Sequence, residues 1–125
     1  MRNFQIPGRS TSYSSEGMVA TSHPIACNVG LDILKKGGNA IDAAVAMSFV
    51  FPICEPQSTG LFGDVFAMVK LNNSKQIIGL NGSGKAPQKI DPENLRNKGF
   101  SYIPEDAVES ITMPGAVAAL ESLNH

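Results

Sequence analysis

The sequence is poor in the side chains that build the most common catalytic and metal sites. It has no tryptophan, only two histidines and only two cysteines. The histidines, His23 and His125, stand far apart, and no HExxH, CxxC or GxSxG motif occurs. Cys27 and Cys54 lie in apolar segments, where a free thiol behaves as a small hydrophobic group, so we favour two thiols over a disulfide. We therefore predict no metal, no cofactor and no complete catalytic set.

A surplus of positive charge and a long apolar run are also missing. The formal net charge is -1 and the lysines are scattered, whereas nucleic-acid binding needs Lys and Arg gathered on one face. The longest apolar run, residues 40–51, has 12 residues, and a helix needs about 20 to cross a bilayer. No apolar stretch of the kind found in secretion signals follows Arg2. We predict a cytoplasmic protein that binds neither nucleic acid nor membranes.

What is present is the composition of one globular domain, with 42% hydrophobic and 17% charged residues. Residues 1–17 are polar and broken by Pro7 and Gly17, so we expect an extended arm. Residues 18–125 then hold the folded part. It begins with residues 18–21, a short apolar run that predicts a buried strand.

Two helices are expected next, joined by the glycine pair Gly37-Gly38. The first spans residues 23–36, with Ser22 or His23 as its N-cap. Apolar residues recur every four positions along one of its faces: Ile25, Val29 and Ile33.

Residues 40–51 predict the central helix, because too few polar side chains remain to keep any face in water. Asn39 is suited to the N-cap, Asp42 follows three residues later as in a capping box, and Pro52 is expected to end the helix. We expect this helix to be buried nearly all round.

Residues 65–71 and 76–80 predict a hairpin whose first strand is covered on both sides. Residues 81–87 leave it as a glycine-rich loop, and one helical turn is expected at 93–98. The last helix begins near Pro114 and has no stop signal, so we interpret the chain as a piece of a longer protein.

Two loops are candidates for chemistry. Residues 58–64 contain Gly60 and Gly63, whose flexibility allows either an anion-binding turn or, as we favour, a tight connection into the strand. Glu55 and Asp64, on either side of that loop, are an acid pair or, more commonly, carboxylates that cap backbone N–H groups.

The second loop, residues 81–87, presents the hydroxyl of Ser83 and the ammonium of Lys85 at the end of a strand. Together they can hold the carboxylate of a small substrate, since charge-assisted hydrogen bonds are the strong ones. The alternative is a hairpin exit with a solvated lysine, which is the commoner state of lysines.

Several blocks of the chain occur in the order typical of one enzyme family. They are GMVATSHPIACNVGLDILKKGGNAIDAAVA, CEPQSTGLFGDVFAMVK, LNGSGKAP and SITMPGAVAALESL. The chain resembles the amino-terminal part of the large subunit of gamma-glutamyltransferases, in a less characterised branch. The resemblance implies an N-terminal-nucleophile hydrolase with an α/β fold, a four-layer αββα sandwich, of which residues 18–125 form an incomplete portion. We interpret these residues of the blocks as structural: Gly37, Gly38, Asn39, Asp42, Pro56, Gly60 and Gly63.

In such enzymes a precursor cuts itself into two subunits, and a Thr at the new amino terminus of the small subunit is the nucleophile. The threonines of this chain are all internal, so it is expected to hold no catalytic residue: Thr11, Thr21, Thr59 and Thr112. The resemblance implies as partners a small amide substrate such as a gamma-glutamyl compound, the remaining large-subunit segment and the small subunit.

The chain departs from the family pattern at two loops. Well-studied members carry Asp-Gly-Arg-Glu-Thr-Ala-Pro, whose Arg binds the α-carboxylate of the glutamyl group, and here Ser83 stands at the Arg position with Lys85 two places later. The glycine-dense loop carries larger residues, Asp64 among them. We predict an amidohydrolase or transpeptidase with Ser83 and Lys85 as substrate anchors. The alternative is a non-catalytic binding or structural module derived from the family.

Overall fold

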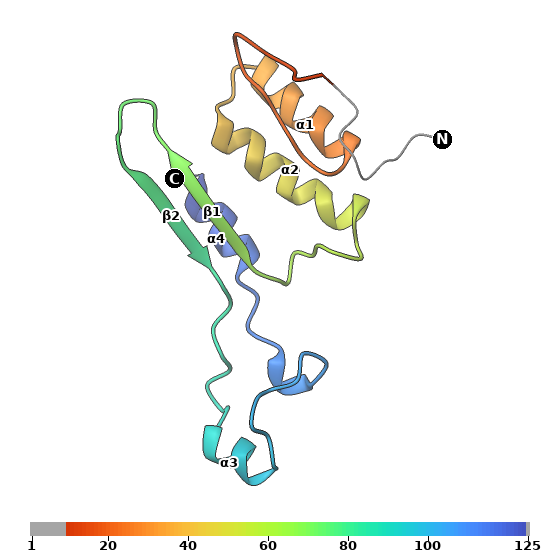
Figure 1. Cartoon of the computed structure of the whole chain (residues 1–125), viewed down its shortest axis with the longest axis vertical. Helices are drawn as coiled ribbons and strands as arrows, with labels where there is room; N and C mark the ends of the chain where they lie inside the picture. The colour runs from red at the N-terminus through yellow and green to blue at the C-terminus, as the bar shows by residue number, and fades with distance from the viewer. Residues whose placement is uncertain (1–9, 125) are drawn as a thin grey trace.

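The computed structural model describes residues 10–124 and contains helices and one β-hairpin (Figure 1). The first nine residues of the predicted arm lie outside the described residues, and residues 10–17 form no helix or strand. The elements follow in this order: α1 (Pro24–Lys35), α2 (Ala40–Cys54), β1 (Val65–Lys70), β2 (Ile77–Gly82), α3 (Pro92–Asn97), the 3-10 helix η1 (Val108–Ser110) and α4 (Ala116–Leu123).

Helices α1 and α2 lie side by side and form the largest packed unit of the chain (Figure 1). The buried residues of α1 are Ala26 and Gly30, and a Cβ at Gly30 would lie 2.7 Å from the sulfur of Met47 in α2. The predicted apolar face is wrong for Ile25, which is 56% exposed. Small residues one helical turn apart let α2 approach more closely than a branched side chain would allow.

The predicted helix starts are confirmed. His23 is the N-cap of α1, and its Nδ1 accepts the N–H of Ile25 at 3.2 Å. At α2, Oδ1 of Asn39 accepts the N–H groups of Ile41 and Asp42, while the Asp42 carboxylate accepts the N–H of Asn39 at 2.8 Å. This reciprocal pair is a capping box, which satisfies N–H groups that the helix itself cannot bind.

The glycine corner between the two helices is built as expected. Gly37 has a φ of +91°, a conformation that side chains disfavour, and it follows the C-cap Lys36. A Cβ at Gly38 would lie 2.6 Å from the side chain of Ile33. Both glycines are therefore required by the local backbone, one by its conformation and one by its neighbours.

The predicted end of the central helix at Pro52 is wrong, because α2 continues to Cys54 with Pro52 inside it. Proline removes one N–H from the helix ladder but leaves the following turn able to bond. The N–H of Glu55 donates to the carbonyl of Phe51 at 2.7 Å and closes that turn. Proline near a helix end thus weakens the helix without stopping it.

The strand predicted at residues 18–21 is also wrong, since in residues 10–124 only β1 and β2 pair. This segment instead runs as extended chain beside α1. The sulfur of Cys27 lies 3.8 Å from the carbonyl oxygen of Val19, and a Cβ at Gly30 would lie 3.1 Å from the Val19 side chain. Its apolar residues are used to cover helices, not to join a sheet.

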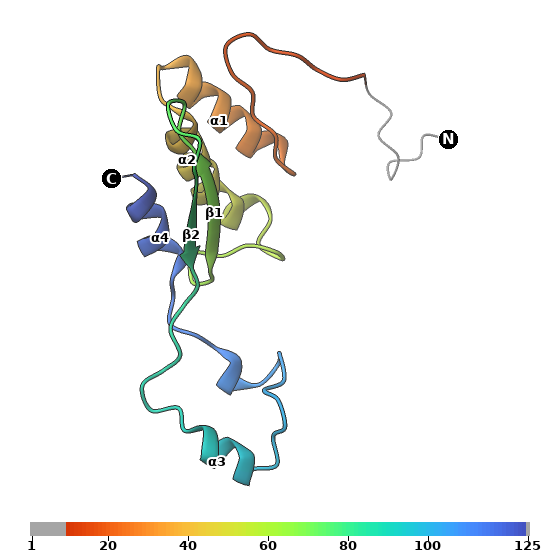
Figure 2. The same ribbon diagram turned by 60° about the vertical axis from the view of Figure 1, so that its left-hand side comes forward.

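The predicted hairpin is confirmed, with β1 and β2 antiparallel and Val65 opposite Gly82. Helix α4 packs on one face of it (Figure 2). Within residues 10–124 the buried hydrophobic side chains are few: Ala26, Ala43, Ala116, Ala119 and Leu120. On the other face Phe66 is 68% and Met68 82% exposed, so the expectation of a strand covered on both sides is wrong for the described residues. The prediction that the central helix is buried nearly all round is also wrong for the described residues, because Ala43 is the one buried residue of α2.

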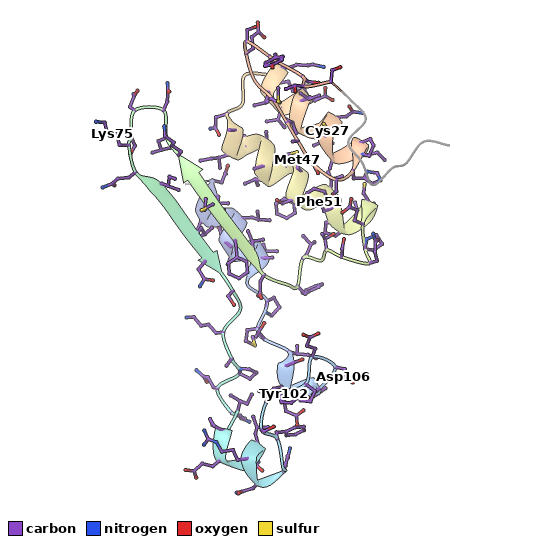
Figure 3. All side chains as sticks on the ribbon, viewed as in Figure 1. Cys27, Met47, Phe51, Lys75, Tyr102 and Asp106 are labelled. Atoms are coloured by element: carbon purple, nitrogen blue, oxygen red, sulfur yellow. The ribbon has the colours of Figure 1, made fainter. Side chains whose placement is uncertain are left out.

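Residues 83–115 leave the hairpin, form α3 and η1, and return to α4 (Figure 1). Helix α3 confirms the single turn predicted near residues 93–98. An ion pair of 3.4 Å between Lys98 and Glu109 joins the two arms of this excursion. Tyr102 and Asp106 lie on its far part, away from the hairpin (Figure 3). No helix within residues 10–124 has the length and hydropathy needed to cross a membrane.

Candidate functional site

A hollow of about 460 Å³ lies where β2, the loop after it and the start of α4 meet. Both predicted substrate anchors, Ser83 and Lys85, line it. Their neighbours in its wall include Met113, Pro114, Gly115 and Ser122. The fold therefore brings the two side chains to one opening, and their role there stays a prediction.

The backbone that carries the two anchors is held on both sides. The N–H of Ser83 donates to Oδ1 of Asn81 at 3.0 Å, which closes a local turn at the end of β2. The carbonyl oxygen of Lys85 accepts the N–H of Met113 at 2.9 Å, which ties the outgoing loop to the returning one. A loop fixed in this way offers its side chains without first having to order itself.

Asp64 makes the third attachment, across 20 residues of sequence. Its Oδ1 accepts the N–H of Gly84, the residue between the two anchors, at 2.7 Å. The structure thus uses Asp64 as a carboxylate that caps a backbone N–H, the commoner of the two predicted roles. Glu55 is the C-cap of α2, and its carbonyl oxygen accepts the hydroxyl of Thr59 at 2.9 Å.

Glycines permit the loops to approach this closely. A Cβ at Gly84 would collide with the carbonyl oxygen of Met113 and lie 2.6 Å from the hydroxyl of Thr112. A Cβ at Gly115 would collide with the carbonyl oxygen of Gly82. Gly82, Gly84 and Gly115 therefore allow backbone to pack directly on backbone.

The loop of residues 58–64 makes the tight connection that the sequence favoured. The carbonyl oxygen of Gly63 accepts the N–H groups of Gly115 at 3.1 Å and Ala116 at 2.9 Å, at the start of α4. The N–H of Gly63 itself donates to the carbonyl of Gly60 at 3.4 Å, within the same loop. Gly60 borders a smaller hollow of about 130 Å³, and Pro56 lies exposed in the turn after α2.

The sequence offered Asp64 as a cap of backbone N–H groups but did not predict its partner Gly84, and it did not predict a role for Gly115 at this site. Each acts on a partner far along the chain, Asp64 on Gly84 and Gly115 on Gly63 and Gly82. The signals available were a carboxylate at the end of a glycine loop and a glycine next to Pro114 in a matched block. Neither signal indicates which residue Asp64 or Gly115 contacts. Among the described residues no cluster of three or more potential metal ligands occurs.

Comparison with known proteins defines the class. The chain belongs to the gamma-glutamyltranspeptidase family, whose family model matches residues 26–125. It is similar to the glutathione hydrolase proenzyme of Bacillus subtilis (strain 168), with 38% identity over 109 residues that cover 86% of this chain and 19% of that protein. It is also similar to the acylase ACY 1 proenzyme of Pseudomonas sp. (strain SE83), with 39% identity over 79 residues, 63% of this chain and 14% of that protein.

Solved structures agree with this assignment. The gamma-glutamyltranspeptidase of Helicobacter pylori matches with a TM-score of 0.78 and 32% identity, over 91% of this chain and 33% of that one. The cephalosporin acylase of Bacillus halodurans matches with a TM-score of 0.74 and 40% identity, over 94% of this chain and 23% of that one. These are N-terminal-nucleophile hydrolases, so the described helices and hairpin form an incomplete N-terminal portion of the αββα sandwich.

The chain spans about a fifth of the length of the curated relatives that it matches first. It corresponds to the N-terminal part of the large subunit in this family of hydrolases and transferases.

Proposed function

We propose that this chain supplies the substrate-anchoring loop of a self-processing amidohydrolase or transpeptidase. The whole enzyme transfers a gamma-glutamyl or related acyl group from a glutathione-like amide to water or to an amine. One observation carries the proposal: Ser83 and Lys85 line the same hollow on a loop whose backbone is held by three hydrogen bonds.

The chemistry of the hollow favours a carboxylate as the group that is anchored. The Ser83 hydroxyl donates one hydrogen bond and the Lys85 ammonium supplies a positive charge. Because an ammonium is a point charge and not a planar fork, it fixes the position of a carboxylate less strictly than an arginine does. The site is therefore suited to a gamma-glutamyl group and equally to an acyl group that ends in a carboxylate.

The nucleophile is proposed to be a Thr outside this chain, at the amino terminus of the small subunit. Its hydroxyl oxygen attacks the amide carbonyl carbon, and its own α-amine passes the proton to the leaving nitrogen, so that the C–N bond breaks and an ester remains. Water or an amine then attacks the ester and releases the Thr. These steps need no cofactor. The chain alone is proposed to be inactive, and its Thr59 hydroxyl is already bonded to the Glu55 carbonyl.

The partners are proposed to be the remaining large-subunit segment and the small subunit. Support comes from the uncovered hairpin face, where Phe66 and Met68 are mostly exposed. Because burying such side chains stabilises a protein by about 1.5–3 kcal/mol each, a face of this kind is normally covered. On this proposal residues 18–125 are part of one larger domain, with residues 1–17 as an arm.

A cytoplasmic location is also proposed. Support comes from Cys27 and Cys54, which are both free and half-buried, as in proteins from reducing compartments. Fractionation of the producing cells, followed by detection of the protein in the cytoplasmic fraction, tests it. Recovery outside the cytoplasm would contradict it.

Mass spectrometry of the purified product of the complete reading frame tests the proposed function. Two subunits with Thr at the amino end of the smaller one, together with release of an amine from gamma-glutamyl-p-nitroanilide or glutaryl-p-nitroanilide, are expected. One uncut chain without amidase activity would favour the alternative, a non-catalytic module derived from the family.

Variants then test the anchors. Ser83→Ala and Lys85→Ala should each raise KM about tenfold, the effect of losing roughly 1.4 kcal/mol of binding. Lys75→Ala is the matched control, because Lys75 is exposed at the far tip of the hairpin (Figure 3). An unchanged KM in both anchor variants would refute the assignment.

A further inference from the structure

We propose that Asp64 is a positioning residue that sets the geometry of the substrate-anchoring loop. The inference rests on the function proposed above and adds a residue outside the loop itself. Asp64 touches neither the scissile bond nor the bound carboxylate in this proposal. It acts through Gly84, whose N–H its Oδ1 accepts at 2.7 Å.

The backbone on both sides of Asp64 is held by hydrogen bonds to other elements. The preceding residue, Gly63, is clamped to the start of α4 by two N–H groups, from Gly115 and Ala116. The following residue, Val65, begins β1 and pairs with Gly82. With its backbone held on both sides, the carboxylate reaches the loop from a rigid base, and rigid support is what keeps a binding group in its productive place.

The loop in turn depends on this attachment. Ser83, Gly84 and Lys85 follow the last residue of β2 and belong to no helix or strand. The bond from Ser83 to Asn81 is local, and the bond from Met113 to Lys85 comes from the other end of the excursion. Among the interactions of these three residues in the described chain, the Asp64 bond is the one that ties the loop to the hairpin entrance.

The bond has a chemical consequence for the hollow. Because Asp64 occupies the N–H of Gly84, that N–H is not offered to a substrate anion. On the loop itself, the Ser83 hydroxyl and the Lys85 ammonium, which flank Gly84 in sequence, remain to face the hollow. Asp64 therefore contributes to binding by determining which groups face the substrate and how far apart they stand.

The test compares Asp64→Ala and Asp64→Asn in the product of the complete reading frame. The Asn side chain keeps an oxygen that can accept the Gly84 N–H, while the Ala side chain keeps none. We expect Asp64→Ala to raise KM about tenfold with kcat within about twofold, and Asp64→Asn to stay within about threefold of the wild-type KM. Asp106→Ala, which removes an exposed carboxylate on the far part of the excursion, should leave both constants unchanged.

Several outcomes would overturn the inference. An unchanged KM in Asp64→Ala, or a decrease confined to kcat, would each do so. Equal rises in KM in the Ala and Asn variants would also do so, because they would assign the effect to the lost charge. If Asp64→Ala yields no two-subunit protein, the Asn variant decides alone, and a tenfold or larger rise in its KM refutes the hydrogen-bond role.

Amide hydrogen exchange distinguishes a failure of this inference from a failure of the proposed function. In the same wild-type protein, the Gly84 amide should be protected, and Asp64→Asn should retain that protection. A wild-type protein without amidase activity but with a protected Gly84 amide would refute the proposed function and leave the attachment intact. An active protein with an unprotected Gly84 amide would refute the positioning role alone.

Discussion

Replacing Gly84 with alanine should separate the two loops that form the hollow. The Cβ of alanine would collide with the carbonyl oxygen of Met113 and approach the Thr112 hydroxyl to 2.6 Å, closer than atoms in folded proteins come. The Met113 carbonyl belongs to the backbone, and rotating the Thr112 side chain would still leave its Cβ 2.9 Å from the new methyl group. The strain must therefore be relieved by moving backbone, and the nearest movable element is the returning loop.

The size of the effect follows from two contributions. Overpacking a tight contact costs about 1–3 kcal/mol, and the hydrogen bond of 2.9 Å from Met113 to Lys85 contributes about 1 kcal/mol that moving the loop would lose. A local destabilisation of at least about 2 kcal/mol corresponds to a roughly 30-fold increase in the population of the open loop.

Amide hydrogen exchange in the product of the complete reading frame measures this population. Exchange of the Met113 N–H should be about 30-fold faster in Gly84→Ala than in the wild type. Gly79→Ala is the matched control, because a Cβ at Gly79 in β2 meets no atom within 4 Å. Equal Met113 exchange in wild type and Gly84→Ala would show that the backbone contact is not tight, and the account of the site would be wrong.

Three further predictions test the fold. Asn39→Ala should destabilise the protein by about 1 kcal/mol through loss of the α2 cap, read from the denaturant midpoint, and an unchanged midpoint would contradict the capping role. Gly37→Ala should cost about 1–2 kcal/mol because of its φ of +91°, whereas Gly60→Ala, with no atom near its Cβ, should cost less than about 0.5 kcal/mol. The isolated chain should bind a hydrophobic dye through Phe66 and Met68 and melt without cooperativity, so a sharp melt with little dye binding would refute the need for covering layers.

The parts of the fold that the sequence predicted are those decided by neighbours in sequence. The capping box of Asn39 and Asp42 and the positive-φ glycine at the helix corner depend on residues a few positions apart, and the antiparallel hairpin joins two strands that follow each other along the chain. Hydrophobic periodicity and capping chemistry act over this range. Local patterns were therefore sufficient for these elements.

The wrong predictions concern segments whose structure is determined by tertiary packing. The run at residues 18–21 has strand composition, but its apolar groups cover α1, and no strand of the described residues lies beside it. Ile25 has helical spacing but is exposed, whereas the buried residues of α1 are Ala26 and Gly30, and Gly30 faces Met47 of α2. An apolar residue indicates that its side chain will be buried, but it does not indicate which element will bury it.

The candidate site divides in the same way. The sequence predicted that Ser83 and Lys85 lie on a glycine-rich loop at a strand end, and the structure has them there, lining one hollow; their role as substrate anchors stays a prediction. It did not predict the bond between Asp64 and Gly84, nor the contact between Gly115 and Gly82, because 20 or more residues separate the partners. Side-chain chemistry can be read from a motif, but the attachment of the motif to the fold requires the structure.

The attachment combines backbone carbonyls and two side-chain oxygens. The carbonyl of Gly63 accepts N–H groups at the start of α4, and the carbonyl of Lys85 accepts the N–H of Met113. The side chains of Asn81 and Asp64 accept the N–H groups of Ser83 and Gly84. Close backbone contacts leave no room for a side chain, which explains why glycine fills positions 82, 84 and 115. The loop is held by neither the Ser83 nor the Lys85 side chain, so on the proposed function these two residues could change with the substrate while the loop keeps its place.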